Sequence, residues 1–146
     1  MFVTNPIGIV GEDTAADLLR KQGFKILERN WRLGHFEVDI IAKDNHTIVF
    51  AEVKARTTTF GDISPEEYVD EGKKRRMTVA ANAYVRLHRI DDLQPRFDII
   101  GVVVNPATHE VVERHHLPGV FSPRTRTITS SAHLPSWRWK MKKKNL

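Results

Sequence analysis

The chain of 146 residues is predicted to fold as one α/β domain, a mixed sheet flanked by helices, with a basic tail after it. Residues 5–23 and 64–88 have the apolar spacing of helices. Three strand-like segments between these helices are joined by short turns, which require antiparallel pairing. Two more strand-like segments follow the second helix, whose length allows a parallel crossover. The predicted order is therefore αβββαββ.

The first helix is expected to begin at Asn5-Pro6 and to end at Gly23. Asparagine is a favoured N-cap, proline a favoured first residue and glycine a favoured stop. Four side chains share one helical face by their spacing: Glu12, Ala15, Ala16 and Leu19. Glu12 is thus predicted to lie at the end of the buried stripe rather than on the solvent side.

Strands are predicted over 25–32, 37–43 and 47–56. Gly34 lies in the first turn, and Asp44-Asn45 is expected to form a tight hairpin turn, because both residues tolerate positive φ. Side chains alternate between the two faces of a strand. One face of the third strand should therefore carry Ile48, Phe50, Glu52 and Lys54.

The second helix is expected to start at Ser64-Pro65-Glu66-Glu67, which has the residue types of a capped N-terminus, and to run to about His88. A break near Gly72 is the alternative to one continuous helix. Basic residues at 73–76 lie within it. Strands follow over 96–104 and 109–115. Asp98 is expected to pair with Arg96 or another cation in a structural role.

Composition excludes several classes of protein. The chain has no cysteine, which removes disulfides and thiolate chemistry and fits a cytoplasmic location. The first residues do not have the pattern of a signal peptide, and the longest apolar stretch, 99–104, is too short to span a bilayer. The seven histidines have no metal-binding spacing.

Charge is unevenly distributed. The whole chain carries +5, whereas residues 1–116 carry a net charge of −2 and residues 117–146 have seven Lys or Arg and no acid. The predicted boundaries are a folded domain over 1–116 and a flexible basic tail over 117–146. Such a tail is typical either of a solvated end or of a segment that binds a polyanion.

Charged residues inside apolar strands are the main functional signal. Asp39 and Glu52 should lie near each other if their strands form a hairpin, with Lys54 on the same face as Glu52. Carboxylates that converge beside an ammonium group can hold a divalent cation next to a phosphate and a water molecule. We expect like-charge repulsion to raise the pKa of one of these carboxylates. A surface salt-bridge cluster is the alternative that the pattern leaves open.

These charged residues belong to a longer set of motifs over about 8–104. The set comprises Gly11-Glu12, Gly23-Phe24, Asn30, Glu37-Val38-Asp39-Ile40-Ile41-Ala42, Val49-Phe50-Ala51-Glu52-Val53-Lys54, Arg56, Phe60-Gly61, Lys73, Arg76 and Arg96-Phe97-Asp98. With these motifs the chain resembles the YraN-type uncharacterised bacterial protein family, which itself resembles Holliday-junction resolvases of the PD-(D/E)xK nuclease superfamily. Val38 stands where the superfamily name has proline.

The resemblance implies a restriction-endonuclease-like core and in-line hydrolysis of a phosphodiester. Asp39 and Glu52 would ligate Mg²⁺ or Mn²⁺ with help from the carbonyl of Val53. Lys54 would orient or deprotonate the attacking water, and Glu12 would complete the catalytic set. A junction-cleaving enzyme needs two sites, which implies a homodimer.

Nucleic acid, preferably DNA, is the expected partner. Residues predicted to contact phosphates are Arg56, Lys73, Arg76, Arg138 and Lys140. The last two lie in Trp137-Arg138-Trp139-Lys140, a mixture of indoles and cations that suits single-stranded nucleic acid and also an anionic membrane surface. The leading hypothesis is a metal-dependent endonuclease acting on branched or structured DNA. The alternatives are a non-catalytic nucleic-acid-binding or repair-accessory protein with the same fold, and an interaction protein anchored by its tail.

Overall fold

The structure is a computed structural model that describes residues 5–61, 67 and 69–121. Its elements follow in the order α1 (Pro6–Lys21), β1 (Lys25–Leu33), β2 (Phe36–Lys43), β3 (Thr47–Arg56), α3 (Glu71–Leu87), β4 (Gln94–Val104) and β5 (Val111–Leu117). This confirms the predicted α/β class and the order αβββαββ, which is consistent with a restriction-endonuclease-like core. In the described part of the chain, no helix is long and apolar enough to cross a membrane.

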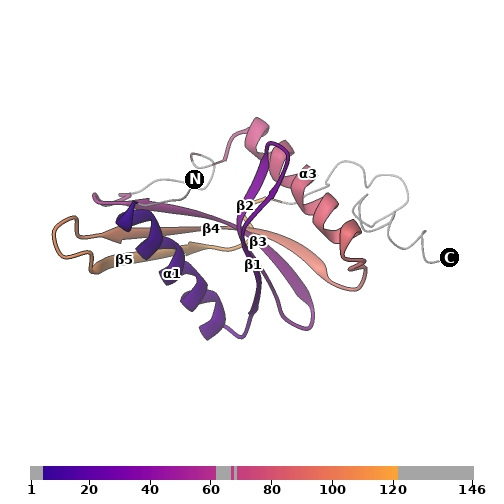
Figure 1. The fold of residues 1–146 in the computed structure, drawn as a ribbon, viewed down its shortest axis with the longest axis horizontal. Coiled ribbons are helices and arrows are strands. Elements are labelled where there is room, and N and C mark those ends of the chain that lie inside the picture. The colour runs from indigo at the N-terminus through magenta and orange to yellow at the C-terminus, as the bar shows by residue number, and fades with distance from the viewer. Residues whose placement is uncertain (1–4, 62–66, 68, 122–146) are drawn as a thin grey trace.

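One five-stranded sheet, in the order β1-β2-β3-β4-β5, forms the centre of the molecule (Figure 1). β1, β2 and β3 are antiparallel neighbours, β3 and β4 are parallel, and β5 returns antiparallel to β4. The parallel pair is possible because α3 carries the chain back across the sheet between β3 and β4. The parallel crossover that the sequence allowed is therefore present.

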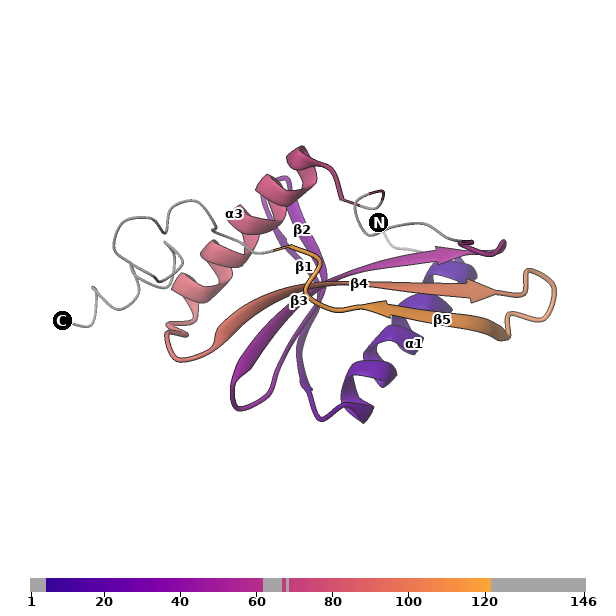
Figure 2. The ribbon, with the colours of Figure 1, turned by 180° about the vertical axis from the view of Figure 1, so that it is seen from behind.

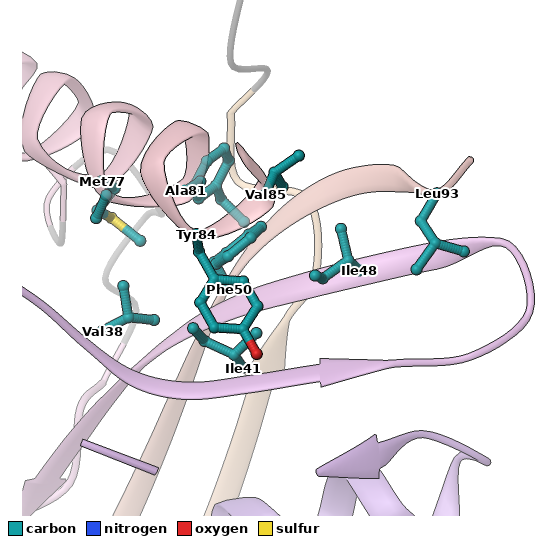
Figure 3. Packing of buried hydrophobic residues seen from close by; sticks show 11 residues of the cluster. Val38, Ile41, Ile48, Phe50, Met77, Ala81, Tyr84, Val85 and Leu93 are labelled. Carbon is teal, nitrogen blue, oxygen red and sulfur yellow. The ribbon is translucent and has the colours of Figure 1, made fainter. Parts of the chain in front are cut away.

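The two helices cover opposite faces of the sheet (Figure 1 and Figure 2). Ala15, Ala16 and Leu19 of α1 pack against a face that includes Val49 and Ala51. On the other face, Figure 3 shows Met77, Ala81, Tyr84 and Val85 of α3 over Val38, Ile41, Ile48 and Phe50. The predicted alternation of side chains along β3 is thus confirmed.

α1 approaches β3 very closely at Gly11. A Cβ atom added there would lie 2.7 Å from the Cβ of Ala55, which is closer than real Cβ atoms come. A glycine is therefore needed at this crossing. The close contact brings the next residue of the helix, Glu12, to the end of β3 that carries Glu52 and Lys54.

Capping residues set the helix ends. The Asn5 side chain accepts a hydrogen bond from the Ile7 N–H at 2.9 Å, and Pro6 follows it, as predicted. α3 begins at Glu71, where the Asp70 side chain accepts a hydrogen bond from the Lys73 N–H at 2.8 Å, and it ends at Leu87 with His88 as its C-cap, close to the predicted end. The start predicted at Ser64 lies outside the described residues. A single helix from there to His88 is wrong, however, because Asp70 is extended and caps a separate helix, which places the break next to Gly72.

The β2–β3 hairpin turns tightly at Asp44-Asn45 as predicted, with the Asp44 N–H donating to the Thr47 carbonyl at 3.0 Å, but the expected positive φ is absent. Among the described residues, positive φ occurs at three non-glycine positions, and neither Asp44 nor Asn45 is one of them. Instead, the Asp44 carboxylate accepts hydrogen bonds from the N–H groups of His46 and Thr47, both at 2.8 Å. This side-chain cap stabilises a turn of ordinary φ, so the left-handed conformation is not needed.

A buried carboxylate fastens the end of the described chain to the sheet. Asp98 is fully buried and accepts two hydrogen bonds from Arg96, one from His116 at 2.7 Å and one from the Gly119 N–H at 3.0 Å. Burial by itself would raise the pKa of Asp98, but the hydrogen bonds from His116, Arg96 and Gly119 lower it overall. The predicted structural pairing of Asp98 with Arg96 is confirmed.

Residues beyond β5 continue along the domain as far as Phe121, whose ring stacks on Phe97 with centroids 4.5 Å apart. The remainder of the predicted tail, including Arg138 and Lys140, lies outside the described residues.

Candidate functional site

The charged cluster lies where β2 separates from β3. The pairing of the two strands runs from Lys43 and Ile48 to Ile40 and Ala51. In the same register the next pair would be Asp39 and Glu52, but the ladder stops there. The Val53 N–H instead donates a hydrogen bond to Oδ2 of Asp39 at 2.8 Å. The carboxylate of Asp39 thus fills the gap between the diverging strands.

Asp39 has a strongly perturbed acidity. Its pKa is raised from 3.8 to about 6 overall. Burial raises the pKa most, the hydrogen bond from Val53 lowers it, and the charges of Glu52, Glu12 and Glu37 raise it by smaller amounts. The expectation of one raised carboxylate pKa is confirmed. Burial, rather than the expected like-charge repulsion, is the largest cause. An environment of this kind favours either a proton or a cation next to Asp39.

Glu52 is held between two ammonium groups. Its Oε2 lies 3.1 Å from the Nζ of Lys54, and its Oε1 lies 3.0 Å from the Nζ of Lys73. Lys54 comes from the same face of β3, as the alternation predicts, whereas Lys73 reaches over from the first turn of α3. The side chain of Glu52 is only 16% exposed, so these ion pairs compensate for much of its desolvation.

Glu12 approaches the cluster from α1 and is oriented by β1. Oε1 of Glu12 accepts a hydrogen bond from the amide of Asn30 at 3.1 Å and lies 3.6 Å from Arg29, which also binds Asp13 at 2.8 Å. The charge of Glu12 contributes to the raised pKa of Asp39. The structure therefore brings all four predicted catalytic residues into one neighbourhood, while their roles stay a prediction.

Sequence reasoning assigned no site role to Arg29 or Asn30. Asn30 has φ of 54°, a left-handed conformation that is unusual within a strand. The pairs on either side, Arg29 with Ile40 and Trp31 with Val38, place Asn30 opposite Asp39. Two signals pointed to Asn30: its place among the motifs of the family resemblance, and an asparagine inside a strand-like segment, since asparagine tolerates this conformation better than most residues.

The predicted phosphate-binding residues have varied positions. Lys73 extends from α3 to the cluster, as predicted, although its partner is Glu52. The Arg56 guanidinium lies over the ring of Phe60, 4.5 Å from its centroid. Arg76 interacts electrostatically with Asp70 at the start of α3. Arg138 and Lys140 lie outside the described residues.

The carboxylates suit a divalent cation held by few protein ligands. In the part of the chain that the structure describes, no three histidine, aspartate or glutamate residues form a ready-made metal cage. Mg²⁺, however, commonly binds one or two carboxylates together with waters and substrate phosphates. Asp39 and Glu52 can supply two such carboxylates, provided that one ammonium group leaves Glu52.

Fold and site together define an α/β protein with a restriction-endonuclease-like topology and a half-buried cluster of acidic and basic side chains. The chain belongs to the uncharacterised protein family UPF0102, whose model matches residues 11–102, and this confirms the YraN-type resemblance. The matched region contains all four predicted catalytic residues.

Curated relatives agree with this assignment. A UPF0102 protein of Bacteroides fragilis is 39% identical over 119 residues, which cover 82% of this chain and 94% of the relative. One from Caldanaerobacter subterraneus is 40% identical over 116 residues, covering 79% and 93%. One from Bacteroides thetaiotaomicron is 46% identical over 99 residues, covering 68% and 80%.

Proposed function

We propose that this protein is a metal-dependent endonuclease that hydrolyses phosphodiester bonds in branched or structured DNA. One observation carries the proposal. Asp39, a half-buried aspartate with a pKa of about 6, lies at the point where two strands separate, beside a glutamate that is paired with two lysines. A salt-bridge cluster that only stabilised the fold would gain nothing from an aspartate whose charged form, the main form at neutral pH, lowers the stability of the folded protein.

Each side chain has a distinct task in this proposal. Asp39 and Glu52, with the carbonyl of Val53, hold Mg²⁺ or Mn²⁺, which would polarise the phosphate and acidify a bound water. Lys54 orients the attacking water and stabilises negative charge on the phosphorane. The water oxygen forms a bond to phosphorus in line with the ester oxygen that leaves, and a proton passes to that leaving oxygen. Glu12, which reaches the site from α1, accepts hydrogen bonds from water molecules next to the attacking water.

Binding to the sugar–phosphate backbone is assigned to Arg56, Lys73 and Arg76, with Arg138 and Lys140 in the tail. Contacts of this kind depend on salt and are independent of sequence. The proposal places the protein in the cytoplasm. It also includes a homodimer, because cleavage of both strands of a junction requires two sites.

A non-catalytic nucleic-acid-binding protein is the second candidate. The observation that favours it is the pairing of both Glu52 oxygens with lysines, since a glutamate held in this way is not free to bind a cation. In this alternative, the acidic and basic cluster stabilises the fold and the basic residues bind DNA without cutting it.

A cleavage assay separates the two candidates. Duplex, single-stranded, flapped and four-way DNA, together with RNA, are incubated with the full chain and Mg²⁺ or Mn²⁺. The variants Asp39→Asn and Glu52→Gln are the matched comparisons, because each removes a charge and keeps the shape of the side chain. Asp44→Asn, in the β2–β3 turn, controls for loss of one carboxylate elsewhere.

The nuclease proposal expects cleavage that requires the metal, that is lost in Asp39→Asn and Glu52→Gln, and that is retained in Asp44→Asn. Binding without cleavage of any substrate would favour the accessory protein. Cleavage that survives both site substitutions would show that the assigned site is wrong.

A further inference from the structure

Lys73 makes a contact that a phosphate-binding residue would not be expected to make in the free protein. Its Nζ lies 3.0 Å from Oε1 of Glu52, one of the two proposed metal ligands. The side chain of Lys73 is 28% exposed and that of Glu52 16%. The ammonium group of Lys73 therefore occupies one of the two oxygens that Glu52 could offer to a divalent cation, while Lys54 occupies the other.

The position of Lys73 in α3 is electrostatically unfavourable. It is the third residue of the helix, where the helix dipole is positive and a cation is destabilising. Its backbone N–H is held by Asp70 at 2.8 Å, which fixes the start of the side chain. Contact with Glu52 compensates for this local cost, and the flexible four-carbon stem allows the ammonium group to move without moving the helix.

Lys54 is the partner of Glu52 that comes from the same strand. It lies two residues away on the same strand and the same face, so both side chains point the same way from one rigid element. Lys73 comes from a separate helix. Of the two ammonium groups, that of Lys73 can leave Glu52 with the smaller change in the sheet.

We propose that Lys73 is the internal counter-ion of Glu52 in the metal-free protein, and that it exchanges Glu52 for a nucleic-acid phosphate when a divalent cation binds. This inference rests on the proposed function, because it assumes that Glu52 is a metal ligand. The exchange couples the two binding events. The cation displaces the ammonium group, and the released ammonium group then binds substrate.

Lys73 and the divalent cation compete for Glu52 in this proposal. A substitution in an active site usually weakens binding, whereas loss of Lys73 should have the opposite effect on the cation. Removal of the Lys73 charge should strengthen binding of the divalent cation, because the cation no longer has to displace an ion pair. The same substitution should weaken binding of DNA, and more so when the cation is present, because only then is the ammonium group free for a phosphate.

Isothermal titration of Mn²⁺ into the full chain tests the first part. The variants are Lys73→Met, which keeps the length and most of the apolar stem, and Lys74→Met, the matched control. Lys74 is the next residue of the same helix and pairs with Glu71 at 3.2 Å, so its loss changes the net charge equally. Asp39→Asn reports whether Mn²⁺ binds at the proposed site.

The expected result is Mn²⁺ affinity about fivefold higher in Lys73→Met than in wild type, the size of effect that a partly exposed ion pair produces. Lys74→Met should stay within about twofold of wild type, since more distant charges are screened. Affinity unchanged or lowered in Lys73→Met, with binding still lost in Asp39→Asn, would overturn the exchange while the metal site stands. Binding by none of the proteins would overturn the site and the exchange together.

Fluorescence anisotropy of a labelled four-way DNA, with and without Ca²⁺ at matched ionic strength, tests the second part. Lys73→Met should weaken DNA binding by about threefold more in Ca²⁺ than in its absence, the scale of one phosphate contact. An equal loss in both conditions would contradict the exchange. Lys74→Met should show the same loss in both.

Discussion

Asp39→Asn should make the metal-free protein more stable at neutral pH, although it removes a proposed catalytic group. The pKa of Asp39 is raised from 3.8 to about 6 in the folded protein. Each pKa unit corresponds to about 1.4 kcal/mol, so the fold prefers the neutral form by roughly 3 kcal/mol. Asparagine is neutral and can still accept the Val53 N–H. The new amide N–H₂ group also needs a hydrogen-bond acceptor, which reduces the benefit. We therefore expect the unfolding free energy to rise by about 1 to 3 kcal/mol.

The sign of the pH dependence follows from the raised pKa. Stability contributed by Asp39 is fully present below its unfolded pKa of 3.8 and is lost as the pH rises through about 6. The difference in unfolding free energy between Asp39→Asn and wild type should therefore be largest at neutral pH and should fall to zero towards pH 4. Urea denaturation followed by circular dichroism, at several pH values without divalent ions, measures it.

The turn residue Asp44 provides a control of opposite sign. Hydrogen bonds from His46 and Thr47 lower its pKa, so its charge stabilises the fold at neutral pH. Asp44→Asn should therefore lower the stability of the protein. A loss of stability in Asp39→Asn at neutral pH, or a gain that does not change with pH, would refute the argument that Asp39 is held in a disfavoured ionised form.

Three further predictions concern the elements around the site. Gly11→Ala should cost about 1 to 3 kcal/mol of unfolding free energy in urea, because the new Cβ would overlap Ala55, and an unchanged midpoint would contradict the close crossing. Asp98→Ala should cost about 3 kcal/mol at neutral pH, because Arg96 loses its buried partner, and the loss should shrink in acid as the wild-type carboxylate is protonated. Asn30→Ala should be about 1 kcal/mol less stable than Asn30→Gly, because only glycine accepts φ of 54° without strain, and equal stabilities would argue against a left-handed residue.

Local sequence signals predicted most of the fold. Asn5-Pro6 marked the start of α1, and apolar alternation placed Ile48, Phe50, Glu52 and Lys54 on one face of β3. These signals act over a few residues, so they are readable without knowledge of the tertiary structure. The proximity of Asp39 and Glu52 followed from the same hairpin, since antiparallel pairing fixes which residues lie opposite each other.

Features that depend on contacts between distant elements were not predictable in this way. The ion pair of Lys73 with Glu52 requires the position of α3 over the sheet, and the contact of Asn30 with Glu12 requires α1 and β1 together. The turn at Asp44 was placed correctly, but its backbone conformation was not predicted, because two solutions suit aspartate. It tolerates positive φ, and it can also cap a turn of ordinary φ with its side chain.

The central claim is that Asp39 and Glu52 form a divalent-cation site where β2 separates from β3. The most direct test is a carbon-13 NMR titration of the Asp39 carboxyl group, in wild type and Glu52→Gln, with and without Mg²⁺. The account predicts an apparent pKa of about 6 in the metal-free protein. Saturating Mg²⁺ should lower it by about 1 unit or more, because the cation favours the ionised form, and Glu52→Gln should weaken this effect. A pKa of Asp39 that Mg²⁺ leaves unchanged would contradict the claim.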